Sequence, residues 1–137
     1  MQGAPRLTFQ KEIEVILARQ LASYLAVPIF IVDPAGTLVY YNEPAESILG
    51  CRFDETGAMP HGEWATVYAP EDEQGVQLAP EALPLAIALS ERRPNNARFW
   101  IKGLDGVRRH IEVTAFPLIG QQARYLGAIA LFWSLDT

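Results

Sequence analysis

The chain contains little that could serve metal or redox chemistry. One cysteine, Cys51, and two histidines occur among its 137 residues. A single thiol cannot form an internal disulfide, and the paired ligand spacings of a zinc site are missing. No stretch approaches the ~20 consecutive apolar residues of a membrane helix, and residues 1–6 do not lead into the apolar core of a signal peptide. We therefore expect a cytoplasmic protein without membrane association.

The composition is that of one folded domain. Half of the residues are apolar, a tenth are aromatic and a fifth are charged, which excludes a disordered chain or a collagen-like repeat. The charge is unevenly distributed: residues 43–91 hold ten acids against one base, and residues 92–137 hold seven bases against three acids. We expect the basic strands to face the acidic segment of the same molecule. We expect no direct binding of nucleic acid, because nonspecific phosphate binders carry excess positive charge.

An amphipathic helix is predicted at the start of the chain. Apolar residues recur at three- and four-residue spacing from residue 8 to residue 25, which places them on one stripe of a helix. Thr8 is a suitable N-cap, and Pro28 lies just beyond the end. We therefore divide the chain into residues 1–25, a dimerisation helix, and residues 26–137, one domain.

The rest of the chain alternates between strands and short helices. Period-two patterns and turn residues predict strands at 28–33, 38–41, 97–102, 107–118 and 125–135, and helices at 43–49 and 84–91. Residues 51–80, rich in proline, glycine and acids, are expected to be irregular. Two strands, short helices and three further strands predict an α+β domain, with a five-stranded antiparallel sheet and short helices on one face.

Two of these strands, 29–32 and 127–133, are apolar on both faces. An antiparallel strand of this kind needs cover on both sides. The first helix could cover the outer face by folding back on its own sheet, or a second copy of the chain could do so. We expect a homodimer whose interface includes Ile13, Leu17, Leu21, Ile29, Ile31, Leu131 and Trp133.

The inner face of the sheet is expected to line a small apolar pocket beneath the helices. Small residues on this face could leave room for an apolar ligand. Alternatively, three phenylalanines fill that room, and the domain only dimerises. The expected lining is Phe30, Val32, Leu85, Leu89, Phe99, Ile101, Val113, Ala115, Ala130 and Phe132.

The order of these segments resembles a PAS domain over residues 26–136. The resemblance rests on Val27-Pro-Ile-Phe-Ile-Val-Asp-Pro-Ala-Gly36, Leu38-Val-Tyr-Tyr-Asn42, Glu43-Pro-Ala-Glu-Ser-Ile-Leu-Gly50, Leu83-Pro-Leu-Ala-Ile-Ala-Leu89, Leu104-Asp-Gly106, Ile111-Glu-Val-Thr-Ala-Phe-Pro-Leu118 and Gly127-Ala-Ile-Ala-Leu-Phe132. It implies a sheet whose first and last strands are adjacent at its centre. It also implies a sensory and homodimerisation module of a histidine kinase, a cyclase or a transcription regulator, with the effector domain in the same or a partner chain. Signals would pass through the N-terminal helix and the C-terminal strand.

The resemblance does not extend to a flavin or haem cofactor. Cys51-Arg-Phe53 is similar to part of the photoactive motif of flavin-binding LOV domains, but the preceding Asn and the following Leu-Gln are missing. Val113 and Phe132 stand where that subclass places amides. Haem-binding members use a histidine on the helix at residues 84–91, which has none here. We expect neither cofactor and no metal site.

We also expect no catalysis by this domain. His110 and Glu112 share one face of a strand and could act as an acid–base pair, although a polar strand exterior is the simpler interpretation. Glu71, Asp72 and Glu73 are consecutive acids beside Pro70, a pattern typical of a solvated turn.

Overall fold

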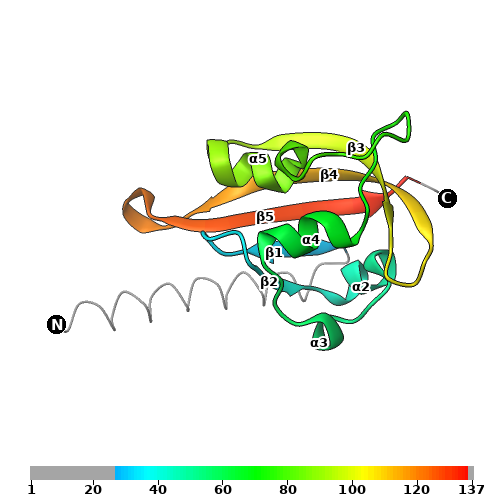
Figure 1. Ribbon diagram of the computed structural model, residues 1–137. Helices are drawn as coiled ribbons and strands as arrows, with labels where there is room; N and C mark the ends of the chain where they lie inside the picture. The colour runs from blue at the N-terminus through cyan, green and yellow to red at the C-terminus, as the bar shows by residue number, and fades with distance from the viewer. Residues whose placement is uncertain (1–26, 136–137) are drawn as a thin grey trace.

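The computed structural model describes residues 27–135, and in this part of the chain one antiparallel sheet of five strands carries helices on one of its faces (Figure 1). The strand order is β2-β1-β5-β4-β3, so the first and last strands are adjacent at the centre, as the resemblance implied. The predicted helix at residues 8–25 lies outside the described residues. The elements are β1 (Ile29–Val32), β2 (Leu38–Tyr41), α2 (Glu43–Leu49), α3 (Phe53–Thr56), α4 (His61–Val67), η1 (Pro80–Ala82), α5 (Pro84–Glu91), β3 (Asn95–Lys102), β4 (Arg108–Ile119), η2 (Gln121–Ala123) and β5 (Tyr125–Ser134).

The β1–β2 hairpin and α2 are held by two short polar side chains. The Asp33 carboxylate accepts from the backbone N–H groups of Ala35 and Thr37, both at 3.0 Å, and so fixes the turn. Asn42 is 1% exposed and caps α2 by accepting from the N–H of Ala45. Asn42 also bonds the backbone ahead of β1, because its Oδ1 accepts from Ile29 at 2.9 Å and its amide donates to a neighbouring carbonyl. This residue therefore joins the first strand to the first helix of the domain.

The segment at residues 51–80 is more ordered than the sequence analysis expected. It contains α3, α4 and η1. The Glu55 carboxylate bonds back to the N–H of Arg52, which closes the first turn of α3. Helix α4 buries Trp64 and is followed by Tyr68, one helical turn further on. Both helices are short, and proline and glycine surround them, so a periodicity argument over a long window overlooks them.

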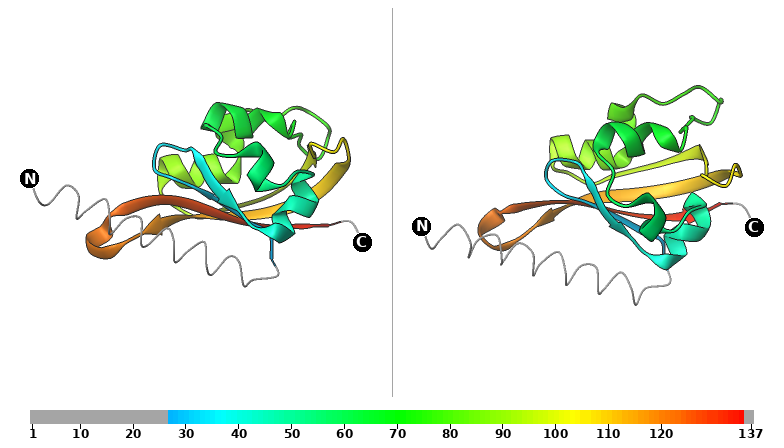
Figure 2. Two further views of the ribbon diagram at one scale, coloured as in Figure 1. Left: turned by 90° about the horizontal axis from the view of Figure 1, so that it is seen from below. Right: turned by 60° about the horizontal axis from the view of Figure 1, so that its bottom comes forward.

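The sheet buries apolar side chains on both faces, as predicted from the two strands that are apolar on both sides. Phe99, Ile101, Val113 and Phe132 point into the main core together with side chains of α2, α4 and α5. Figure 2 shows the green helices gathered on this side of the sheet. A second cluster lies on the opposite face of the central strands. It consists of Ile29, Ile31 and Ile129, with Val39, Tyr40, Phe116, Leu118 and Leu131 packed against it.

Candidate functional site

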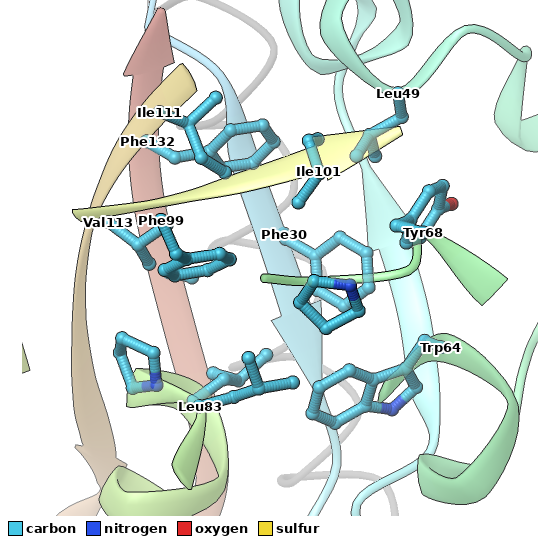
Figure 3. A pocket seen from close by; sticks show the side chains of 14 residues that line it. Phe30, Leu49, Trp64, Tyr68, Leu83, Phe99, Ile101, Ile111, Val113 and Phe132 are labelled. Atoms are coloured by element: carbon cyan, nitrogen blue, oxygen red, sulfur yellow. The ribbon is translucent and has the colours of Figure 1, made fainter. Parts of the chain in front are cut away.

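An apolar cavity of about 80 Å³ lies between the inner face of the sheet and the segment from α4 to the start of α5 (Figure 3). Strands β1, β3, β4 and β5 form one wall, and helical and loop residues form the other. Its lining comprises Phe30, Leu49, Trp64, Tyr68, Pro70, Leu83, Pro84, Leu85, Phe99, Ile101, Ile111, Val113, Ala130 and Phe132.

The cavity offers a ligand no charge and almost no hydrogen-bonding group. All fourteen lining residues are buried. The indole N–H of Trp64 already donates to the carbonyl of Gly36 at 2.7 Å. The Tyr68 hydroxyl points away from the cavity in Figure 3, and burial raises its pKa well above the usual value, so it stays neutral. The cavity therefore favours ligands whose surface is apolar.

Aromatic contacts fix the shape of one end of this space. The ring of Phe30 meets Trp64 edge-on, with centroids 5.6 Å apart, and lies parallel to Tyr41 at 6.0 Å. Such pairs add stability beyond the area that they bury. Because the three rings come from β1, β2 and α4, they hold α4 at a defined distance from the sheet.

Seven of the ten residues expected to line the pocket do so, and Val32, Leu89 and Ala115 do not. Val32 and Ala115 are fully buried in the same core, and Leu89 packs against it. Val32 and Ala115 each lie two residues further along their strand than a lining residue, and Leu89 lies one turn beyond Leu85. Helix α5 packs against β4, the strand that carries Ala115. Alternation predicts the inward face but not how far along an element the cavity extends.

Seven lining residues were missed, and three of them, Trp64, Tyr68 and Pro70, belong to the segment that the sequence analysis left irregular. Trp64 and Tyr68 are four residues apart, a helical spacing that would have indicated α4. Leu83 and Pro84 directly precede Leu85 at the start of α5. The others are Leu49, Pro70 and Ile111.

The volume limits what the cavity can hold. An engineered apolar cavity of roughly 150 Å³ takes up benzene or xenon, whereas pockets for drug-sized ligands measure roughly 300–1,000 Å³. At about 80 Å³ the space suits a small apolar molecule. A flavin or a haem would require the walls to move apart.

Cys51 lies outside this lining, in the link between α2 and α3. Its carbonyl accepts from the hydroxyl of Tyr41 at 2.7 Å. Desolvation and the neighbouring Glu55 carboxylate raise the pKa of the Cys51 thiol, which favours the protonated, unreactive form. These contacts favour a structural role for Cys51.

The residues expected at the dimer interface divide into two groups. Ile29 and Ile31 are buried in the outer-face cluster, Leu131 packs against it, and Trp133 is 39% exposed at the end of β5. Ile13, Leu17 and Leu21 lie outside the described residues.

The polar face of β3 and β4 carries ion pairs with the acidic segment, as the charge distribution predicted. Arg108 pairs with Glu71 at 3.1 Å, and the imidazole of His110 contacts the carboxylate of Glu73 at 2.6 Å. The side chains of Glu71 and Glu73 in the expected solvated turn are 37% and 49% exposed, and each also contacts a side chain of β4. His110 and Glu112 do not form the acid–base pair considered above: Glu112 faces Arg98 at 3.4 Å instead.

No group of three or more His, Cys, Asp or Glu side chains within residues 27–135 could hold a metal ion. None of the helices described there is both long and apolar enough to cross a membrane.

The similarity of this chain to known proteins is found in its structure and not in its sequence. No family model matches the chain, and no curated protein matches its sequence. The PAS domain of BvgS from Bordetella pertussis is 14% identical, with a TM-score of 0.59 over 90% of this chain and 87% of that one. The PAS domain of an HTR-like protein from Haloarcula marismortui is 16% identical, with a TM-score of 0.59 over 93% of this chain and 98% of that one. The RsLOV d2 variant is 19% identical, with a TM-score of 0.69 over 93% of this chain and 68% of that one. With the strand order β2-β1-β5-β4-β3, these matches show that the chain has the PAS domain fold.

Proposed function

We propose that this domain is a sensory and homodimerisation module of a cytoplasmic signalling protein. Its effector would be a histidine kinase, a cyclase or a transcription regulator, in the same chain or in a partner chain. The observation that carries the proposal is the second apolar cluster, on the outer face of the two central strands. A domain that only needed a core would place polar side chains on this face.

The dimer contact would combine this outer face with the predicted helix at residues 8–25. Trp133 supports that arrangement, because a large aromatic side chain with 39% of its surface exposed is typical of an interface anchor. It lies beside Leu131 on β5, next to the buried isoleucines of β1. A signal could then pass between copies through the helix and the C-terminal strand.

The oligomeric state of three variants tests the interface. Leu17→Glu together with Leu21→Glu, and separately Trp133→Lys, should give folded monomers by light scattering. Val107→Lys is the matched control, because Val107 is an exposed apolar residue, at 47%, that lies outside the outer-face cluster. It should remain a dimer. Dimers in both interface variants would overturn the proposed contact.

The cavity supports a second candidate function, which is the sensing of a small apolar ligand. About 80 Å³ of space without polar groups favours an uncharged molecule that makes no hydrogen bonds, because a polar ligand would lose its bonds to water there. Native mass spectrometry of the purified protein, together with its absorbance spectrum, tests this. Extra mass that denaturation releases would support a ligand, and a colourless protein at the bare chain mass would favour a module that only assembles.

We propose that the domain itself catalyses no reaction and binds no nucleic acid directly. His110 contacts Glu73 and stacks on Trp100, with ring centroids 4.5 Å apart, which gives it a structural role. The basic side chains of Arg108 and Arg109 pair with acids of the same chain. Any turnover that disappears in the His110→Ala variant would contradict this proposal.

A further inference from the structure

Residues 69–78, which we name the strap, connect α4 to the segment before η1 and run along the edge strand β3. The strap begins at Ala69, whose φ of 47° places a non-glycine residue in the left-handed region. It turns at Asp72, whose carboxylate accepts from two backbone N–H groups of the strap itself. The strap then folds back on itself, and the backbone N–H of Leu78 donates to the carbonyl of Pro70 at 2.9 Å. In Figure 1 it is the green loop that projects beyond β3.

The strap is part of the cavity wall. Pro70 lines the cavity, as do Tyr68 just before the strap and Leu83, which follows η1. Leu78 packs against the same core. Because every lining residue is buried, movement of a section of the wall would widen the access of a molecule to the cavity.

The backbone of the strap is bonded to the sheet through a short pairing with the edge strand β3. Glu71 and Trp100 exchange two backbone hydrogen bonds, at 2.9 and 2.8 Å, and Lys102 donates to the carbonyl of Tyr68. The opposite wall is held by continuous ladders between β1, β5, β4 and β3. Segments with few backbone bonds and exposed side chains open at the lowest free energy.

A stack of three side chains on the outer face of β3 and β4 holds the strap in place. The Arg108 guanidinium lies 4.0 Å from the centroid of the Trp100 ring, and the His110 ring stacks on Trp100 with centroids 4.5 Å apart. Two strap carboxylates reach around the sheet edge to the ends of this stack, Glu71 to Arg108 and Glu73 to His110. Contacts on the outer face of the sheet therefore hold a segment that lines the cavity on the inner face. The carbonyl of His110 also accepts from the N–H of Leu135, directly after β5.

We propose that the strap is the gate of the apolar cavity, and that the Arg108–Trp100–His110 stack with Glu71 and Glu73 sets how often the gate opens. This inference rests on the proposed binding of a small apolar ligand. Removing the two carboxylates should speed the uptake and release of a ligand equally. The affinity should stay the same, since neither carboxylate lines the cavity.

Xenon is a suitable probe, because apolar cavities take it up without hydrogen bonds. The variant Glu71→Gln with Glu73→Gln should exchange xenon, measured by ¹²⁹Xe NMR, roughly tenfold faster than the unaltered protein, as the loss of one partly exposed ion pair and one imidazole–carboxylate hydrogen bond implies. Glu63→Gln with Glu81→Gln, exposed acids on either side of the strap, is the matched control and should exchange at the original rate. Amide hydrogen exchange should rise at Glu71 and Trp100 and stay unchanged in β5, which shows that the fold is intact.

A disulfide across the strap tests the same gate in the opposite direction. Glu71 and Trp100 face each other as a hydrogen-bonded antiparallel pair, so their Cα atoms lie about 5.5 Å apart, within disulfide range. Glu71→Cys with Trp100→Cys, in a Cys51→Ser background, should exchange xenon at least tenfold more slowly when oxidised than when reduced.

The outcomes separate the two proposals. Faster exchange in the carboxylate variant and slower exchange in the oxidised disulfide support the gate. Xenon binding at one common rate in all variants overturns the gate and leaves the cavity as a binding site. An absence of xenon binding in every variant overturns the ligand-sensing function, and the gate with it.

Discussion

The cavity can be tested through stability, by adding carbon atoms at a residue that lines it. A void of about 80 Å³ costs about 2 kcal/mol at ~24 cal/mol per Å³. Ala130→Val adds two carbon groups on the inner face of β5, worth up to ~1.6 kcal/mol at ~0.8 kcal/mol each if they enter empty space. Allowing for imperfect fit, we expect the free energy of unfolding to rise by about 1 kcal/mol.

Ala128→Val is the matched control for this substitution. Ala128 lies on the same face of the same strand, two residues away, and is fully buried, but it faces Val32 and Pro117 rather than the cavity. The same two groups should overpack the core there and lower the free energy of unfolding by about 1–3 kcal/mol. Urea denaturation of both variants measures the difference. Equal destabilisation at both positions would refute the argument, because it would show that no usable space exists beside Ala130.

Three further predictions concern the scaffold. Gly127→Ala should lower the free energy of unfolding by at least ~2 kcal/mol, measured by urea denaturation, because φ is 126° and a Cβ would collide with the carbonyl oxygen of Val32; a stable variant would contradict the close approach. Asn42→Ala should cost about 3 kcal/mol in the same assay, because it removes an N-cap and two other bonds of a buried side chain, and a loss under 1 kcal/mol would be too small for that role. Arg109 lowers the pKa of Asp105, so the stability that Asp105 contributes is present above its unfolded-state pKa and lost as pH falls through its lower folded-state pKa. Acid titration of Asp105→Asn should therefore show a shallower loss of stability, and an unchanged slope would exclude this contribution.

The sequence predicted the strands well because each carries its own local signal. Leu38–Tyr41 follows a turn whose aspartate bonds two backbone N–H groups, and Phe99 and Ile101 alternate with polar neighbours. The site was harder to predict, because alternation gives the direction of a side chain but not its depth. Ala115 and Val113 share one face of β4, yet only Val113 lines the cavity. The far wall depends on Trp64 and Tyr68, whose helix is too short for its periodicity to be evident, and on Pro70, which pairing at the sheet edge brings into place.

The position of β5 has a consequence for how the chain folds. Of the five described strands, β5 is synthesised last and lies in the middle of the sheet, where it pairs residue 131 with residue 29 on one side and with residue 114 on the other. The β1–β2 and β3–β4 hairpins can form early from local contacts, but among the described strands only β5 pairs with both of them. Closing so long a loop late in folding costs chain entropy and slows the final step. Until then both hairpins expose edges to other chains, so the nascent domain is most prone to aggregation just before β5 is synthesised.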